Sequence, residues 1–367
     1  MHTSTKIRSG AGVITLALAL TGSGFIAACA AQRSTNNQAS FIDPLKRSEL
    51  RERAFEMLLD AAASNDPLLR ANAIEALQIA PGRVEPLVRS ALHDDNIGVR
   101  YAAAMTVGKL QLHESAPFVE PLLNDPDRRV RAGAIFALHQ TTGKVDPSPL
   151  AAMLEDRDPQ IRALGAFVLG EMGDASAIPM LREAAKARVA TAPLSQTRLM
   201  RLQIAEALVK LGDLDALETI RAALYPSRPE DLEATALAVQ IIGQVGDRRS
   251  IDQLIYLTAM RGEDRMPAEV RLAAASSLAQ LGLPQGAFIA REFLDNTLPA
   301  LRAQAAYVLG ETGGTENLGK LNELMQDRTG IVSVTAASSV LRITDRLAGQ
   351  DLYRRSPGNV RSASAEP

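Results

Sequence analysis

The feature that most constrains this chain is a motif of roughly 31 residues that recurs along most of its length. Residues 158–187 show one copy in full. Its apolar residues follow helical spacing, at i, i+3, i+4, i+7, i+8 and i+11: Ile161, Leu164, Gly165, Val168, Leu169 and Met172. This is the stripe of an amphipathic helix. The motif therefore predicts a helix with one face to bury.

The ends of this helix are also marked in the sequence. Asp158 is placed as an N-cap, and Pro159 follows at the first helical position, where a missing N–H costs nothing. Gly173 is placed as the C-terminal cap, and a second short helix is expected from Ala175. Two such helices cannot bury their apolar faces alone, so each pair needs a neighbouring copy on either side.

The copies are found by following Arg162 as a marker. Equivalent positions recur at intervals of 30 to 39 residues: Arg70, Arg100, Arg131, Arg162, Arg201, Thr235, Arg271, Arg302 and Ser333. A glycine lies eleven residues after five of these markers, as Gly173 does after Arg162. The uniform period predicts one elongated array of helix pairs over residues 44–347.

This pattern resembles the HEAT-repeat family, in particular its short, phycobilisome-lyase-like repeats. The resemblance rests on an aspartate that precedes an apolar residue and the arginine, as in Asp127/Arg131, and on an Ala-rich helix that ends in Leu-Gly. It implies an all-α fold, a right-handed α-solenoid of about nine helix pairs. It also implies that the seven marker arginines are structural and pair with acids of their own or the next repeat, rather than forming an anion-binding row: Arg70, Arg100, Arg131, Arg162, Arg201, Arg271 and Arg302.

Residues 1–28 have the pattern of a bacterial export signal. Lys6 and Arg8 form a basic start, an apolar run follows, and Ile26-Ala27-Ala28-Cys29 resembles a lipoprotein processing box. The alternative is an uncleaved membrane anchor, which Gly22-Ser23-Gly24 disfavours. Cys29 is the only cysteine of the chain, so we expect it to carry the lipid and to attach the protein to a membrane.

Residues 29–43 are expected to join the lipid to the folded part as a flexible tether, because residues 31–40 are polar and have no apolar period. The first helix, residues 44–63, has a strongly charged outer face, as the terminal cap of an open stack requires. Three longer loops interrupt the array, at residues 186–199, 225–231 and 261–268. Residues 348–367 have no apolar period and are predicted to form a disordered, mildly basic tail.

Charge and reactive residues argue against nucleic-acid binding and catalysis. Removal of residues 1–28 takes Lys6 and Arg8 and no acid, leaving 38 basic and 42 acidic residues, which is no basis for a nucleic-acid binder. The histidines do not form a metal-binding spacing, and no glycine-rich phosphate loop is present. We therefore expect no enzyme, no metal and no cofactor.

One line of residues suggests a binding surface. The positions one and five residues after the marker lie off the core stripe, and in HEAT-type stacks they line the concave side. Four large apolar residues occupy this line in neighbouring repeats: Tyr101, Met105, Phe136 and Phe167. A partly exposed apolar strip is typical of a groove for a peptide or helix. The alternative is that these side chains fill gaps between neighbouring helices.

These observations favour a membrane-anchored scaffold or assembly factor of the bacterial envelope, which binds a protein partner through its concave face. Ala30 follows the lipidated cysteine in place of aspartate, which favours the outer membrane if the host has one. The alternative function is a bilin-lyase-like or other HEAT-repeat enzyme. Such lyases act in the cytosol, which conflicts with an export signal.

Overall fold

In the computed structural model, residues 43–187, 192–259 and 265–355 are described, with backbone alone for residues 350–355. All regular structure in these ranges is helical. The all-α solenoid of helix pairs is thereby confirmed. The predicted signal peptide 1–28, Cys29 and all but the last residue of the tether 29–43 lie outside these ranges.

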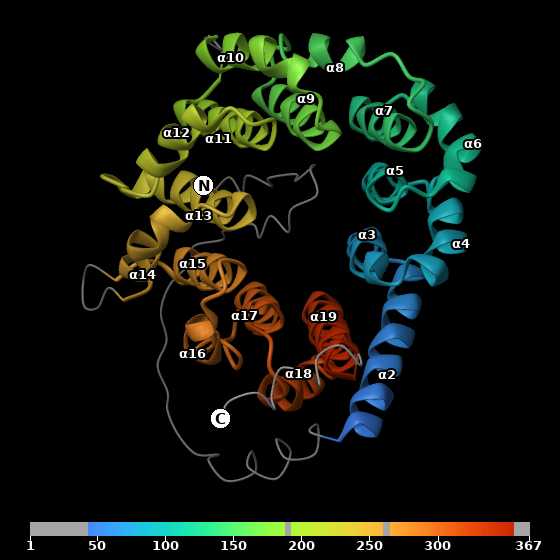
Figure 1. The fold of residues 1–367 in the computed structure, drawn as a ribbon, viewed down its shortest axis with the longest axis vertical. Helices are drawn as coiled ribbons and strands as arrows, with labels where there is room; N and C mark the ends of the chain where they lie inside the picture. Colours follow the sequence, from blue (N-terminus) through green and yellow to red (C-terminus); the bar gives the residue numbers. More distant parts are fainter. Residues whose placement is uncertain (1–42, 188–191, 260–264, 356–367) are drawn as a thin grey trace, which may run out of the picture.

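The helices form two concentric layers (Figure 1). The outer layer holds the first helix of each pair: α2 (Pro44–Ala62), α4 (Pro81–Ala91), α6 (Ala116–Val119), α8 (Ser148–Met153), α10 (Ile178–Lys186), α12 (Leu217–Ala222), α14 (Ile251–Ala259), α16 (Ala287–Arg291) and α18 (Leu318–Leu324). The inner layer holds the second helices: α3 (Pro67–Ala76), α5 (Ile97–Lys109), α7 (Arg128–Thr142), α9 (Pro159–Met172), α11 (Leu194–Lys210), α13 (Leu232–Val245), α15 (Ala268–Gln280), α17 (Pro299–Thr312) and α19 (Gly330–Arg355). Short 3-10 turns, such as η5 (Ala175–Ala177) and η10 (Pro284–Gly286), lead into most outer helices.

The local signals at the helix ends act as the sequence predicts. The Asp158 side chain accepts a hydrogen bond from the Gln160 N–H at 2.9 Å, with Pro159 in the first turn of α9. Gly173 ends the helix with φ at 80°, a left-handed conformation that costs glycine little. Asp66 and Asp127 cap α3 and α7 in the same way as Asp158.

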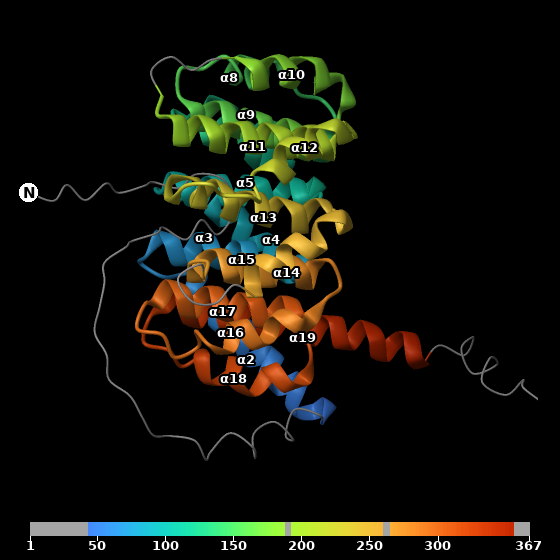
Figure 2. The ribbon, with the colours of Figure 1, turned by 90° about the vertical axis from the view of Figure 1, so that its left-hand side faces the viewer.

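The predicted end of the last helix is wrong. α19 continues past residue 347 to Arg355, so part of the expected disordered tail is helical. Figure 2 shows this end of α19 extending beyond the body of the molecule. No glycine or proline interrupts residues 350–355, so nothing in this sequence stops the helix at residue 347. The remaining predicted tail, residues 356–367, lies outside the described residues.

The array is not an open arc, because its two ends meet and close a ring (Figure 1). α19 packs against both α2 and α3. Arg51 of α2 donates to Asp345 of α19 at 2.7 Å, and Leu69 of α3 lies against Gly330 at the start of α19. The charged face of α2, expected to cap a free end, therefore supplies part of the closing interface.

The inner helices approach one another at two alternating separations. A glycine eight residues after the marker faces a small residue of the next inner helix, in four helix pairs: α5/α7, α9/α11, α13/α15 and α17/α19. At Gly170 an added Cβ would lie 2.9 Å from the Ala207 Cα, and at Gly310 it would lie 3.0 Å from the Ser339 Cα. In the intervening pairs, bulkier residues such as His139 and Val209 occupy the glycine position. The true structural period is therefore two helix pairs.

The marker arginines connect the turns of successive pairs. Arg302 donates from Nε to Asp327 at 2.8 Å and from Nη1 to the Asn296 carbonyl, six residues earlier, at 2.7 Å. Arg70 and Arg100 make the same two kinds of contact. Arg131 and Arg162 keep the bond to the carbonyl six residues earlier. These contacts place the markers in the scaffold of the fold.

Acid should unfold the ring by protonating aspartates that accept hydrogen bonds from arginines. Asp327 accepts from the marker Arg302, and Asp247 accepts from Arg221 of α12, which is not a marker. Hydrogen bonds from Arg302 and Arg221 hold the pKa values of Asp327 and Asp247 below their usual range. A lowered folded-state pKa stabilises the fold above the unfolded value, about 3.9 for aspartate, and this stability is lost as pH falls below it. We expect the melting temperature, followed by circular dichroism, to drop steeply below about pH 4. Arg302→Gln should flatten that drop, and a melting temperature unchanged to pH 2.5 would contradict this account.

Candidate functional site

A groove on the outer surface, between α14 and α16, is the best-formed candidate site. It forms a partly open hollow of about 760 Å³, with α15 and η10 behind it. Much of its lining is apolar: Ile255, Ala259, Leu278, Leu283, Phe288 and Ile289. Cavities of this size and lining are typical of binding sites.

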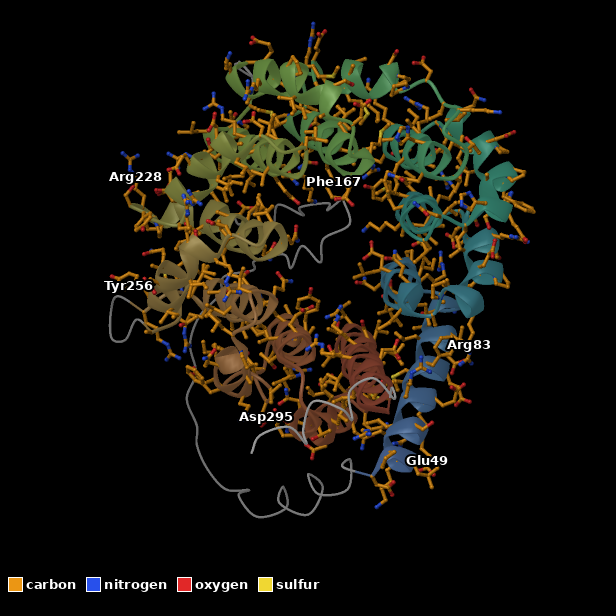
Figure 3. All side chains as sticks on the ribbon, viewed as in Figure 1. Glu49, Arg83, Phe167, Arg228, Tyr256 and Asp295 are labelled. Atoms are coloured by element: carbon orange, nitrogen blue, oxygen red, sulfur yellow. The ribbon has the colours of Figure 1, made fainter. Side chains whose placement is uncertain are left out.

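Apolar side chains continue from the cavity onto the surface. In α14, Leu254, Leu257 and Thr258 form the buried stripe, which leaves Ile255 and Tyr256 exposed. On the facing helix α16, Phe288 is 58% exposed. Figure 3 shows Tyr256 on the outer edge of the molecule. An apolar patch next to an apolar cavity is the usual mark of an interaction surface.

One end of the groove is charged. Glu292, at the C-terminal end of α16, accepts two hydrogen bonds from Arg271, at 2.9 and 3.0 Å. Arg265 also donates to Glu292. The Arg271 guanidinium holds the pKa of Glu292 below its usual range, so the carboxylate stays ionised. Among the described residues, two cations thus share this one carboxylate.

Arg271 differs from the marker arginines that follow short loops, such as Arg70, Arg100 and Arg302, because a long loop precedes it. Among the described residues it has no bond to the carbonyl six residues earlier, and its acid partner lies 21 residues later. Its side chain is buried, with the whole residue 4% exposed, and no described group accepts a hydrogen bond from its Nε. Arg201, which also follows a long loop, likewise has an unpartnered Nε in the described part of the chain.

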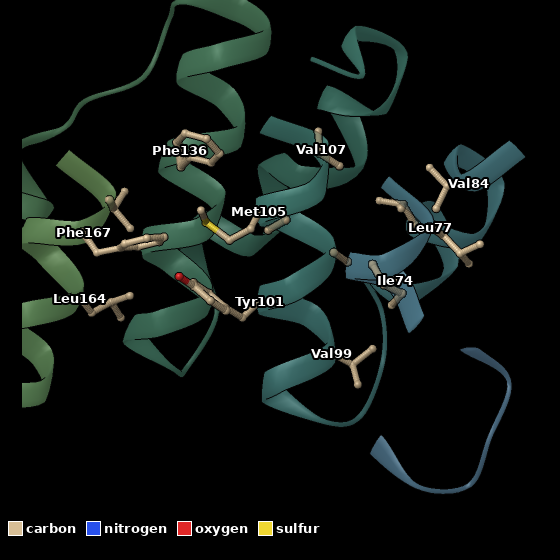
Figure 4. Close-up of a cluster of buried hydrophobic side chains, with 14 of the residues drawn as sticks. Ile74, Leu77, Val84, Val99, Tyr101, Met105, Val107, Phe136, Leu164 and Phe167 are labelled. Atoms are coloured by element: carbon tan, nitrogen blue, oxygen red, sulfur yellow. The ribbon is translucent and has the colours of Figure 1, made fainter. Parts of the chain in front are cut away.

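The predicted concave strip is not an exposed surface. Tyr101, Met105, Phe136 and Phe167 are each at most 9% exposed. They lie together between α5, α7 and α9 (Figure 4). The Phe136 ring packs over Gly108, and the Tyr101 ring packs against Gly133. The four side chains therefore fill the space between neighbouring inner helices. For Tyr101 and Phe136, a glycine on the adjacent helix leaves room for the ring.

Two charged clusters on the inner helices were not predicted from the sequence. In each, a cation bonds to a glutamate of the preceding inner helix and lies near an aromatic ring: Lys210 with Glu171 (2.7 Å) and Phe167 (5.4 Å), and Arg342 with Glu311 (2.7 Å) and Tyr307 (4.8 Å). Burial lowers the pKa of Lys210, but Glu206 and Glu171 outweigh burial and raise it. The sequence does carry a signal for both clusters. An aromatic residue lies five residues after the marker and a glutamate nine residues after it, as Phe167 and Glu171 do after Arg162.

Within the described ranges, no three His, Cys, Asp or Glu side chains gather in a group able to hold a metal ion. Within the same ranges, no helix has the length and apolar character needed to cross a membrane.

The fold defines a helical-repeat protein with an apolar groove on its outer layer. A family model described as HEAT repeats matches residues 55–139, and one described as PBS lyase HEAT-like repeat matches residues 161–187 and 200–225. The chain therefore contains HEAT repeats, a repeat type that typically binds protein partners. No curated protein matches it in sequence.

Several solved structures are similar in fold. The complex of CpcE and CpcF of phycocyanin lyase from Nostoc sp. PCC7120 is 20% identical, with 70% of this chain and 94% of that chain covered and a TM-score of 0.36. Human deoxyhypusine hydroxylase in complex with glycerol is 16% identical, with 83% and 100% covered and a TM-score of 0.35. An engineered protein is 16% identical, with 85% and 99% covered and a TM-score of 0.32.

Proposed function

We propose that the protein is a lipid-anchored scaffold of the bacterial envelope that holds a partner protein in the groove between α14 and α16. The observation that carries the binding role is the apolar groove, whose lining residues Ile255 and Phe288 are also exposed at the surface. The groove replaces the concave strip as the docking surface, because Phe136 and Phe167 are buried between helix pairs.

The anchoring role is supported by the sequence at the start of the chain. Ile26-Ala27-Ala28-Cys29 has the form of a lipoprotein box, and Cys29 is the single cysteine of the chain. Lipidation there would place the helical ring at a membrane surface. Ala30 after the cysteine favours the outer membrane in a host that has one.

Cys29→Ser should release the protein from the membrane or leave it unprocessed with residues 1–28 attached. Two or three acyl chains bind a bilayer far more firmly than one, so the unmodified protein should remain with the membrane through a high-salt wash. Fractionation and the mass of the N-terminal peptide measure both outcomes. Processing and membrane retention equal to those of the unmodified protein would refute the lipid anchor.

The scaffold role is tested by crosslinking in intact cells, followed by purification and mass spectrometry. A scaffold should bring down a defined protein in crosslinked form. Recovery of a bound pigment would instead favour the lyase-like alternative.

A further inference from the structure

We propose that the ring changes shape by bending between rigid blocks, each made of two helix pairs. The four blocks are α4–α7, α8–α11, α12–α15 and α16–α19, and the single pair α2 and α3 joins the last block to the first. Bending of this kind requires neither a lipid anchor nor an occupied groove.

Within a block, the two inner helices touch through their backbones. An added Cβ at Gly170 would lie 2.9 Å from the Ala207 Cα, and one at Gly243 would lie 2.8 Å from the Ser277 Cα. Ser277 also donates a buried hydrogen bond of 2.7 Å to the Val239 carbonyl. Movement of one helix across the other would bring main-chain atoms into collision, and these cannot rotate away as a side chain can. Each block should therefore move as one body.

Between blocks, and between α3 and α5, the same positions hold larger residues. The glycine and its small partner on the facing helix are replaced by these residues at the four junctions α3/α5, α7/α9, α11/α13 and α15/α17: Gln78 and Thr106, His139 and Val168, Val209 and Ile241, Ala279 and Val308. The second residue of each pair is β-branched, and these four junctions make less extensive contacts than the four glycine crossings. Less extensively packed contacts open at a lower free energy.

The bonds between inner helices at these junctions come from long side chains. Gln140 of α7 donates to the Glu171 carbonyl of α9 at 3.3 Å, and Gln304 of α17 donates to the Glu269 carbonyl of α15 at 3.2 Å. A long side chain can follow a small movement of its partner by rotating about its own bonds. The junctions therefore combine fewer contacts with bonds that tolerate bending, as hinges between packed bodies do.

The closed seam decides what this bending does to the molecule. α19 packs against α2 and α3 (Figure 1), so a bend at one junction must be compensated at the others. The ring then becomes more oval while the seam stays closed. The groove between α14 and α16 lies across a junction, because α14 belongs to the third block and α16 to the fourth. Its width should change with the shape of the ring.

Nitroxide spin labels on the outer helices measure this movement. Ala152 of α8, Glu183 of α10 and Thr219 of α12 are exposed, and the full-length Cys29→Ser chain in detergent has no other thiol. One variant carries Ala152→Cys and Glu183→Cys, within a block, and the other carries Glu183→Cys and Thr219→Cys, across the α11/α13 junction. We expect pulsed EPR to give a distance distribution about twofold broader for the second variant.

Gly170→Ala tests whether the glycine crossing makes the block rigid. The added methyl group would force α9 away from α11, because the Ala207 Cα lies in its way. The distribution between labels at Ala152 and Glu183 should then broaden about twofold, with circular dichroism confirming that the helices remain. Gly82→Ala in α4 meets no heavy atom within 4 Å and should leave this distribution unchanged.

Distributions of equal width for the two label pairs in the chain with both glycines intact would overturn the proposal. So would a broader distribution within the block than across the junction. Equal broadening by Gly170→Ala and Gly82→Ala would show that the glycine crossing does not hold the block together. If Gly170→Ala does not fold, the comparison between the two label pairs still decides.

Discussion

Phe136→Ala should lower the free energy of unfolding by about 3–5 kcal/mol. The ring is 2% exposed and packs over Gly108 of α5, so its removal leaves a cavity between α5 and α7. Those helices cannot close the gap without moving every helix pair they contact. Urea unfolding followed by circular dichroism measures the loss.

Phe118→Ala provides the matched control. Phe118 is 41% exposed on α6 and lies 5.2 Å from the Arg89 guanidinium. Its truncation removes much less buried surface and should cost about 1 kcal/mol. If the two alanine variants are equally stable, Phe136 does not bridge the helix pairs, and its role as an exposed binding residue must be reconsidered.

Gly170→Leu should destabilise the ring by about 3 kcal/mol or more, because it forces a close helix crossing apart. A Cβ at this position would lie 2.9 Å from the Ala207 Cα, which is backbone and cannot rotate away. Hydrogen exchange should show the largest loss of protection in α9 and α11. Chemical denaturation gives the total loss.

Gly82→Ala is the control for this substitution. Gly82 lies in α4 with no heavy atom within 4 Å of an added Cβ. Alanine there should leave the free energy of unfolding unchanged or raise it by up to about 1 kcal/mol, because it lowers the conformational entropy of the unfolded chain. Similar losses at Gly170 and Gly82 would show that the crossing of α9 and α11 is not limited by the glycine.

Most of the helical architecture could be predicted because its signals are local. Asp158, Pro159 and Gly173 lie within one helix and its caps, and their effect on where the helix begins and ends does not depend on distant residues. The closed shape could not be predicted in this way. It depends on how neighbouring inner helices pack, and the residue at the contact differs between Gly170 and His139. The effects of all the contacts add up over nine helix pairs.

In the candidate site, too, features set by one helix could be predicted from the sequence, whereas features that depend on distant residues could not. The exposed pair Ile255 and Tyr256 could have been found, because Leu254 and Leu257 already account for the buried stripe of α14. The role of Arg271 could not, because it depends on a long loop that displaces its usual carbonyl partner and on Glu292 from the next pair. The burial of Tyr101 depends on Gly133 of the adjacent helix, which a single-helix pattern does not reveal.

Closure limits how this chain can vary in length. An open solenoid can gain or lose a repeat by gene duplication or deletion, since each unit contacts only its neighbours. Here the contact of Arg51 with Asp345 exists only when the turns of all nine pairs add up to a full circle. A tenth pair, or the loss of one, would separate α2 from α19 and expose both closing faces to water. The number of repeats is thus a fixed property of this architecture, and evolutionary change in size is restricted to loops such as residues 261–268.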